Sequence, residues 1–227
     1  RRLGRPFHLI AESDANDARL VRPRGQGGFG LAASWADDFH HAAHTLLTGE
    51  RAGYYQDFGE LSDLVWAYRD AWVYAGRYSP HRRRQHGNSP KGLGRDRFVV
   101  CVQNHDQVGN RALGERISAV APLGRVAAGA ALVLTSPFTP MLFMGEEYGD
   151  PAPFPYFVDH SDPELLEAVR QGRAAEFAGF EWAGETPDPA SPATFASAHL
   201  SPALRTQPPH QDLEDLYRDL LSLRRRH

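Results

Sequence analysis

Cysteine is almost absent from this 227-residue sequence, in which Cys101 is the single one. One cysteine cannot form an intramolecular disulfide, so the fold has to be stable without such a cross-link. Cys101 lies inside an apolar segment, where a buried and unreactive thiol is expected. This cysteine usage is typical of a reducing compartment, and we expect a cytoplasmic protein.

The sequence also lacks a hydrophobic run of the length that a membrane helix needs. Its most apolar segment, residues 127–134, contains Gly129 and is far shorter than the roughly 20 residues of a spanning helix. The apolar residues 7–11 are too few for the core of a signal peptide, and no small-residue cleavage site follows them. We therefore expect no membrane anchor and no export.

Positive charge is not in excess, since 25 Lys and Arg stand against 28 Asp and Glu, for a formal net charge of -3. No overall basic field is present to hold nucleic acid or an anionic membrane, so the expected substrate is neutral or locally recognised. Hydrophobic residues make up 41% of the sequence, which is enough for a sizeable core. Aromatic residues, at 11%, suit a carbohydrate enzyme and an ordinary core equally well.

The sequence does contain a recurring pattern of short apolar runs that end in polar or ionisable residues. Three such runs, residues 7–11, 98–102 and 141–144, are followed at once by carboxylates, amides or His. Each run has the length and composition of a buried strand. Helical patterns lie between them, and this alternation predicts the α/β class with a parallel sheet.

The helical patterns are apolar residues at three- and four-residue spacing, bounded by capping and breaking residues. The predicted helices are residues 39–47 before Gly49, 61–72, a helix ending near 136, one beginning at Asp162-Pro163, and 213–221 followed by three Arg. Residues 79–97 and 184–209 have no periodicity and are predicted loops.

Polar groups at the carboxyl ends of successive parallel strands indicate where chemistry takes place. Active sites of (β/α)8 barrels lie at this end of the strands, and open doubly wound sheets follow the same rule. The strand pattern by itself therefore leaves both folds open. The sequence has no Gly-rich phosphate loop of the kind that favours the doubly wound fold.

Four segments resemble one enzyme family. Residues 103–111 read QNHDQVGNR and resemble the His-Asp region of the alpha-amylase superfamily, in the form typical of maltooligosyltrehalose trehalohydrolases. Residues 10–14 (IAESD) are similar to the segment with that family's general acid, and residues 35–41 (WADDFHH) and 142–147 (LFMGEE) to its strand-six and strand-eight segments. The resemblance covers nearly the whole chain in the family's order. It implies a (β/α)8 TIM barrel of the alpha-amylase type, of which strands 5–8 and their helices are present.

The resemblance also assigns candidate site residues. It makes Glu12 the general acid and Asp106 the carboxylate that stabilises the transition state. Residues around the cut bond are expected to bind the substrate, with Trp35 and Phe39 as sugar platforms. These substrate-binding candidates are Trp35, Asp37, Asp38, Phe39, His40, His41, His105, Gln107 and Asn110.

The implied activity is that of a retaining glycoside hydrolase in trehalose biosynthesis. It cuts the α-1,4 bond next to the terminal trehalose of maltooligosyl trehalose and releases trehalose. Retention requires a proton donor and a carboxylate nucleophile about 5 to 5.5 Å apart. No metal and no organic cofactor are expected. The implied partners are this or a related α-glucan and, functionally, a maltooligosyltrehalose synthase.

The nucleophile of the implied mechanism is not in this sequence. In the family it ends the strand-four region, which precedes the general-acid strand. The carboxylates Asp14, Asp17, Asp37 and Asp38 follow their strands, and none stands in an Arg-x-Asp context. We therefore expect residues 1–227 to be a partial catalytic barrel domain that lacks the upstream half and a C-terminal β-sandwich. Such a chain is expected to be inactive alone.

Other readings of single residues remain open. Asp106 can be read as a helix cap, and adjacent Glu146 and Glu147 point in different directions, so they are expected to hold loops together. His40 and His44 share a helix face, yet a metal site would need a third ligand that the sequence does not supply. For the whole chain, the alternatives are another alpha-amylase-superfamily enzyme such as a glycogen branching enzyme, or a non-catalytic glucan-binding half barrel.

Overall fold

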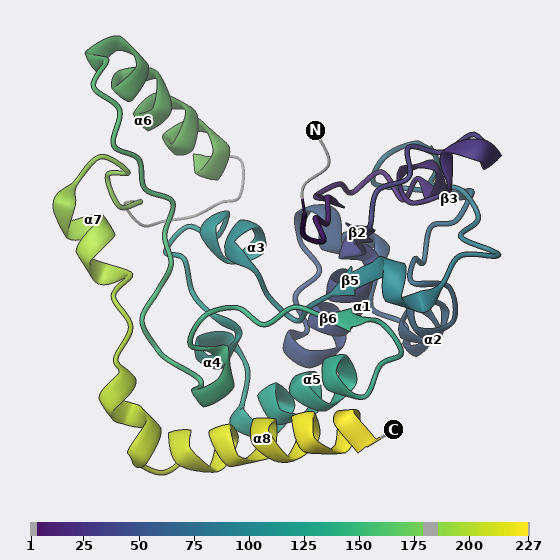
Figure 1. The fold of residues 1–227 in the computed structure, drawn as a ribbon. Helices are drawn as coiled ribbons and strands as arrows, with labels where there is room; N and C mark the ends of the chain where they lie inside the picture. Colours follow the sequence, from purple (N-terminus) through teal and green to yellow (C-terminus); the bar gives the residue numbers. More distant parts are fainter. Residues whose placement is uncertain (1–3, 179–185, 227) are drawn as a thin grey trace. The chain divides into compact units, whose positions relative to one another are not determined.

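The computed structural model of the chain describes residues 4–178 and 186–226 (Figure 1). The chain divides into two compact units. Unit 1 comprises the described residues of Arg1–Val102, Gly124–Leu142 and Asp219–His227, and unit 2 those of Gln103–Leu123 and Phe143–Arg218. The predicted general acid therefore lies in unit 1, whereas the His105–Asp106 segment lies in unit 2.

Unit 1 is built on a parallel four-stranded sheet with the order β1-β2-β5-β6. Helical segments connect each strand to the next one in this order, as parallel pairing requires. The register places Ala11 beside Ser34, and Trp35 beside Val99. The strands are β1 (Ile10–Ala11), β2 (Ala33–Trp35), β5 (Phe98–Val100) and β6 (Thr139–Pro140).

The strands differ in burial according to their place in the sheet. All three residues of the inner strand β5 are buried, and Cys101 just after it is buried as well, as predicted. The prediction of a buried strand over residues 7–11 is wrong. The strand comprises only Ile10–Ala11, and the side chains of Phe7, Leu9 and Ile10 are more than half exposed. The physical reason is that β1 is an edge strand of the sheet, with a neighbour on one side only.

Helix α1 (Asp37–Thr48) follows β2 and provides much of the core of unit 1. It ends at Gly49, which has the left-handed conformation (φ 84°) and donates its N–H to the Thr45 carbonyl. The predicted stop is thus confirmed. The N-cap is Ala36, which has no side-chain bond, so neither Asp37 nor Asp38 caps the helix. Asp37 instead lies in the first turn, where negative charge is favourable.

Helix α2 (Leu61–Asp70) packs against α1. A capping box begins it, in which Glu60 and Asp63 each accept a hydrogen bond from the other's backbone N–H. The predicted apolar stripe is only partly buried, since Leu64 is covered but Leu61 is 69% exposed. Trp72, the last residue of the predicted helix, lies beyond the observed helix end and is buried in the core.

Helix α5 (Leu123–Leu134) approaches the sheet closely at a glycine. A Cβ placed on Gly129 would lie 3.0 Å from Leu47 and 3.1 Å from Val102, so a larger residue would push the helix away. Glycine is needed here for packing rather than for a special backbone angle. The helix ends two residues before Ser136, in agreement with the sequence prediction.

The end of helix α8 (His210–Arg226) lies beside α5 (Figure 1). The Arg224 guanidinium donates to the carbonyl of Leu134 at 3.0 Å, to that of Ser136 at 2.6 Å, and to that of Phe138. These carbonyls end α5 and precede β6. Arg224, one of the basic residues predicted at the end of the last helix, therefore satisfies polar groups of a neighbouring segment.

The predicted loop 79–97 contains regular structure. An antiparallel hairpin joins β3 (Arg77–Ser79) and β4 (Arg84–His86), and Arg83 in its turn has a positive φ of 53°. The alternation of apolar and polar residues that marks a strand is not visible in this segment, because its strands are only three residues long and mostly polar. Four short 3-10 helices complete unit 1: η1 (Ala18–Leu20), η2 (Arg24–Gln26), η3 (Gly53–Asp57) and η4 (Arg95–Arg97).

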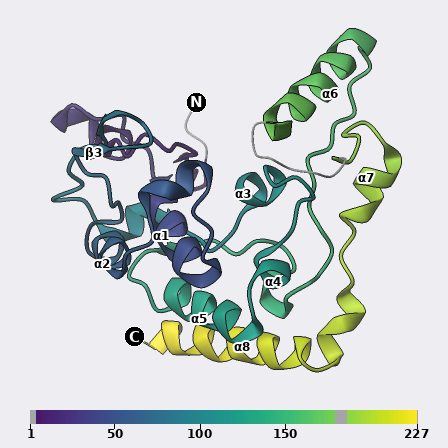
Figure 2. The same ribbon diagram turned by 180° about the vertical axis from the view of Figure 1, so that it is seen from behind.

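Unit 2 has no strand among its described residues. It consists of α3 (His105–Gly109), α4 (Ile117–Val120), η5 (Glu146–Tyr148), α6 (Pro163–Ala178), α7 (Pro192–Ser197), η6 (Pro202–Thr206) and the first half of α8. Helix α6 begins as predicted, since the Asp162 carboxylate accepts the N–H of Glu164 at 2.9 Å. Helix α6 (Figure 2) is hydrogen-bonded to α3, since the Arg173 guanidinium donates to the Gly109 carbonyl at 3.0 Å, and none of the side chains described for α6 is buried.

A row of four aromatic rings, three partly exposed and one exposed, runs through unit 2. Phe143, Phe154, Phe157 and Phe195 follow one another with edge-to-face contacts and centroid distances of 5.2 to 5.5 Å. Gly114 (φ +69°) lets the backbone come close to this row, because a Cβ there would lie 2.3 Å from the backbone nitrogen of Pro155. None of the helices in residues 4–178 and 186–226 has the length and apolar character needed to cross a bilayer.

Candidate active site

Glu12 follows β1 directly, at the carboxyl end of the strand. Because Ala11 pairs with Ser34 in the neighbouring strand, Glu12 lies at the level of Trp35, the last residue of β2. The Glu12 side chain is exposed and that of Trp35 is partly exposed. Both predicted residues therefore occupy the end of the sheet where barrel enzymes place their chemistry.

The loop after Glu12 is fixed to the β3–β4 hairpin. Asp14 accepts a hydrogen bond from Arg82 at 2.8 Å, and the His86 ring bonds the Asp14 carbonyl at 2.8 Å. Burial raises the pKa of Asp14, but the bond and the charge of Arg82 outweigh it and leave this pKa below its ordinary value. Asp14 is therefore an ionised structural partner close to the predicted acid.

The predicted substrate-binding residue Asp38 is buried at the start of α1. Its Oδ2 accepts hydrogen bonds from the Asn16 side chain at 2.9 Å and from the backbone N–H groups of Val73 and Tyr74 at 2.9 and 2.8 Å. Burial raises the pKa of Asp38 to about 6, against the opposing effect of these donors. Asp38 thus joins three distant segments of unit 1, whereas its neighbour Asp37 is partly exposed.

His40 and Phe39 are also buried in unit 1. The His40 Nδ1 lies 2.8 Å from the Val102 carbonyl, which can only accept, so this nitrogen carries the proton. Its Nε2 then accepts from the Tyr55 hydroxyl at 3.0 Å. Burial, and after it the charges of His44 and His41, lowers the pKa of His40 well below its ordinary value. Phe39 has no exposed surface and packs against the rings of Tyr68 and Phe138.

His41 lies in an aromatic cluster with Tyr54, Tyr55 and Phe58, at centroid distances of 4.8 to 5.4 Å. Burial, followed by the charge of His44, lowers the pKa of His41 to about 3. This imidazole is therefore neutral in the folded protein at any pH well above 3.

We expect this neutral His41 to make the protein less stable in acid. Between its unfolded pKa of 6.5 and its folded pKa of about 3, only the unfolded state takes up the proton. Its contribution is complete above pH 6.5 and falls with pH below that, by up to about 1.4 kcal/mol per unit. Urea unfolding midpoints at pH 7.5 and 5, compared between the wild type and His41→Phe, measure this contribution. The variant should show a smaller fall, whereas the exposed His160→Phe should behave as the wild type; an equal fall in all three would contradict the assignment.

The neighbouring His44 takes part in a polar contact rather than in a metal site. Its Nε2 lies 2.7 Å from a Glu50 carboxylate oxygen, and its ring stacks on Tyr55 at a centroid distance of 4.5 Å. No group of three His, Cys, Asp or Glu side chains within the described residues could hold a metal ion. The arrangement provides no support for the metal reading of His40 and His44.

In unit 2, the predicted His105–Asp106 segment opens helix α3. The side chain of Asn104 is the N-cap and accepts the backbone N–H of Asp106 at 2.9 Å and that of Gln107 at 3.1 Å. The side chains of His105 and Asp106 are exposed. One Asp106 carboxylate oxygen accepts from the Asn110 amide at 2.7 Å, so two predicted site residues contact each other.

Gln107, unlike His105 and Asp106, is buried. Its Oε1 has no hydrogen-bond partner among the described groups. A buried amide oxygen without a partner is costly, and a donor such as a sugar hydroxyl would satisfy it. This oxygen is the single orphaned acceptor among the candidate site residues whose side chains are described.

The residues that support α3 were not predicted from the sequence. Asn104 was part of the recognised motif, but its capping role was not assigned, although Asn before a helix start is a known signal. Gln103, Glu146 and Tyr217 form a buried group behind the same segment, and they are far apart in the sequence. No local pattern could have connected them.

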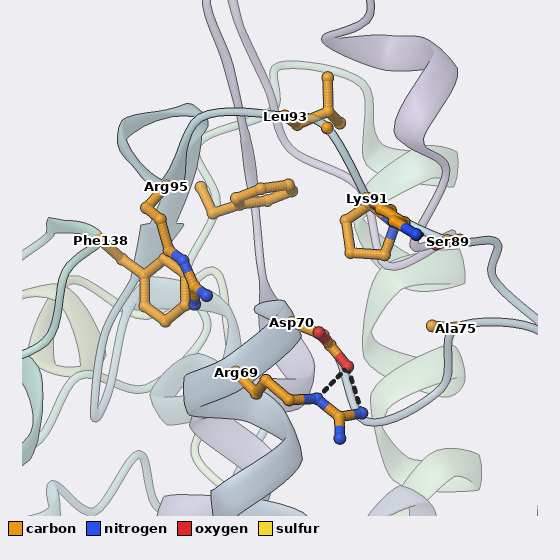
Figure 3. Close-up of a pocket in the computed structure, with 11 residues that line it drawn as sticks. Arg69, Asp70, Ala75, Ser89, Lys91, Leu93, Arg95 and Phe138 are labelled. Carbon is orange, nitrogen blue, oxygen red and sulfur yellow. Dashed lines mark hydrogen bonds and ion pairs between the residues drawn. The ribbon is translucent and has the colours of Figure 1, made fainter.

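A pocket of about 430 Å³ lies at the other end of the sheet of unit 1 (Figure 3). Phe98, the first residue of β5, and Phe138, which precedes β6, line it together with Lys91. In Figure 3 the ion pair of Arg69 and Asp70, with N–O distances of 2.6 and 2.8 Å, borders the pocket. None of the candidate site residues lines it. The pocket marks the amino ends of the strands, which contribute to barrel stability rather than to chemistry.

The parallel sheet and the polar strand ends define the class. The chain is an α/β protein that contains part of a (β/α)8 barrel of the alpha-amylase type, as the sequence predicted. A crystal structure described as a candidate alpha-amylase from Salmonella typhimurium matches it with a TM-score of 0.89 and 40% sequence identity. The match covers 98% of this chain and 38% of that chain.

Curated relatives identify the family more closely. A protein of Arthrobacter ramosus is 51% identical over 225 residues, one of Mycobacterium tuberculosis 47% over 225, and one of Saccharolobus solfataricus 46% over 217. All three are named malto-oligosyltrehalose trehalohydrolase, a glycosidase. The chain is therefore a homologue of malto-oligosyltrehalose trehalohydrolases, and the resemblance seen in its motifs is confirmed.

The relationship extends over 96–98% of this chain but only 37–39% of the length of these three relatives. No protein-family model matches the chain.

Proposed function

We propose that this chain supplies the acid catalyst and the transition-state carboxylate of a retaining glycoside hydrolase. The bond that it cuts is the α-1,4 linkage next to the terminal trehalose of maltooligosyl trehalose. The observation that carries the proposal is the 51% identity to a curated trehalohydrolase over 98% of the chain. In support, Glu12 stands at the carboxyl end of β1, and α3 exposes Asp106 immediately after the β5 segment.

In the first step, protonated Glu12 donates its proton to the glycosidic oxygen of the leaving trehalose. A carboxylate nucleophile outside this sequence attacks the anomeric carbon and forms the glycosyl-enzyme. In the second step, Glu12 as carboxylate takes a proton from water, whose oxygen attacks the same carbon and releases the glucan. Asp106 strengthens its hydrogen bonds to sugar hydroxyls as positive charge develops on the ring.

Substrate contacts in this proposal come from the predicted residues that are accessible or lack a partner. Trp35 beside Glu12 offers an aromatic surface to a sugar ring, and Asp37, His105 and Asn110 offer hydrogen bonds. Gln107 contributes its unsatisfied Oε1. Asp38, Phe39, His40 and His41 are buried and engaged within unit 1, so their predicted substrate contacts are not carried into the proposal.

The 227-residue chain is proposed to be inactive alone, because the mechanism needs the second carboxylate. The full-length protein is proposed to act in trehalose biosynthesis in the cytoplasm, on the product of a maltooligosyltrehalose synthase. No metal or organic cofactor is part of the proposed mechanism.

The test is an assay of trehalose release from maltooligosyl trehalose by a protein of the relatives' full length, with the 227-residue chain in parallel. Linear maltooligosaccharide of equal length is the control substrate. We expect trehalose from the full-length protein, little product from the control, and none from the short chain. New branch points in the glucan would instead indicate a branching enzyme, and binding without any reaction would indicate a glucan-binding protein.

A further inference from the structure

Glu146 is a buried carboxyl group in unit 2 that the mechanism above does not use. It begins η5, and its residue is 2% exposed. Its Oε1 accepts from the Tyr217 hydroxyl at 2.9 Å, and its Oε2 from the Phe143 N–H at 3.3 Å. The Gln103 side chain also hydrogen-bonds it. Burying an ionisable group with three specific partners is expensive, so a role beyond filling space is expected.

Gln103 connects this carboxyl group to the start of α3. It is 3% exposed, and its Oε1 accepts the backbone N–H of Ile117 at 3.1 Å, which leaves its amide nitrogen to donate to Glu146. Both ends of the Gln103 amide are therefore held. The next residue is Asn104, whose side chain caps the helix on the N–H groups of Asp106 and Gln107.

A buried arginine near Glu146 provides a compensating charge. Arg116 is 1% exposed and donates to the carbonyls of Ala152 at 2.6 Å and Met144 at 2.7 Å, while its guanidinium lies over the Phe143 ring. The charge of Glu146 acts favourably on this Arg. Burial raises the pKa of Glu146 to about 7, and Glu147 adds to this, whereas the bonds from Tyr217, Phe143 and Gln103 oppose it.

A continuous path thus runs from Glu146 through Gln103 and Asn104 to the backbone of Asp106. We propose that Glu146 is a positioning residue of the glycosidase: by holding Gln103, it fixes the Asn104 cap and thereby the place of the Asp106 carboxylate. This inference rests on the proposed function only for the catalytic role of Asp106. The positioning itself is a property of unit 2 and can be measured separately.

The kinetic test uses three variants of the full-length protein. Glu146→Leu removes the acceptor of Gln103, and we expect kcat for trehalose release to fall on the order of 10-fold to 100-fold with little change in KM. Glu146→Gln keeps an oxygen that can accept the Gln103 amide and should recover most of the loss. Glu147→Gln, the matched control at the adjacent partly exposed carboxylate, should leave kcat unchanged.

A double variant separates positioning from general destabilisation. If Glu146 acts through Asp106, adding Glu146→Leu to Asp106→Asn should reduce kcat no further. If the losses in kcat of the two single variants multiply in the double variant, the proposal is overturned. A rise in KM of Glu146→Leu without a fall in kcat would overturn it as well. Gln103→Met removes the other partner of the Gln103–Glu146 hydrogen bond. If Glu146→Leu does not fold, the same kinetic comparison can therefore be made with Gln103→Met. Failure of both variants to fold would make the network a folding element and overturn positioning.

A second test of the positioning role measures structure and does not depend on activity. Amide hydrogen exchange of the wild type and Glu146→Leu should show faster exchange in peptides covering residues 104–110, with exchange in β5 and α5 unchanged. Unchanged exchange in residues 104–110 overturns the positioning role whatever the enzyme does. A wild type that releases no trehalose, together with the expected exchange difference, overturns the proposed function alone.

Discussion

Replacing Glu12 by Gln in the full-length protein is expected to lower kcat for trehalose release by about 10²-fold to 10⁴-fold. Gln has nearly the same shape but cannot give a proton to the leaving oxygen. Glu12 follows β1 at the level of Trp35, so the change leaves the sheet register and the core untouched. Initial rates on maltooligosyl trehalose, with circular dichroism to verify folding, measure the effect.

The leaving group distinguishes a lost proton donor from a lost substrate contact. Fluoride leaves a maltooligosyl fluoride without being protonated, so kcat/KM, which reports the first step alone, should fall far less for Glu12→Gln on the fluoride than on maltooligosyl trehalose. The control is Asp96→Asn, an exposed carboxylate in η4 at the opposite end of the strands. It should be active on both substrates. Equal losses of kcat/KM for Glu12→Gln on the two substrates would remove Glu12 from the acid role.

Replacing Asp106 by Asn should lower kcat by about 10²-fold to 10³-fold, and by a similar factor on both substrates. The reason is that Asp106 acts on the developing charge of the sugar ring, which forms whatever the leaving group is. Its carboxylate accepts from Asn110 at 2.7 Å, and the Asn104 cap holds its backbone, so Asn at this position keeps the helix. The measurement is the ratio of the two losses, compared with that for Glu12→Gln.

Asp162→Asn is the matched control for this variant. Asp162 also stands at a helix start, where it accepts the N–H groups of Glu164 and Leu165, and it is exposed. The Asp162→Asn variant should lose little activity, because Asn caps helices about as well as Asp. If Asp106→Asn were equally harmless, Asp106 would be a helix residue only, and the capping reading that the sequence left open would replace the catalytic one.

Much of the local structure could be predicted from the sequence. The stop of α1 at Gly49 and the start of α6 after Asp162 depend on contacts within one helical turn, so neighbouring residues are sufficient to predict them. The inner strand β5 could be read from its continuous apolar run. The β3–β4 hairpin could not, because its three-residue strands are polar and border a segment rich in Gly and Pro.

The burial of the polar candidate site residues could not be predicted from the sequence. Asp38, His40 and His41 belong to a motif that resembles a substrate-binding segment, yet each is enclosed in unit 1 by residues from other segments. The donors to Asp38 lie 22 to 36 residues away, and the carbonyl that accepts from His40 lies 62 residues away. A periodic pattern reports which face of a helix is apolar, but not which polar groups meet a distant partner.

The amino-acid sequence by itself determined the class, the family and the two carboxyl groups proposed for catalysis. It could do so because strand runs, helix ends and motif strings are properties of consecutive residues. Only the tertiary structure assigned Asn104 to the cap of Asp106 and Glu146 to Gln103, and it alone left the Gln107 amide oxygen without a partner. The bond between Glu146 and Tyr217 joins residues 71 positions apart, and such hydrogen bonds exist only after the chain has folded.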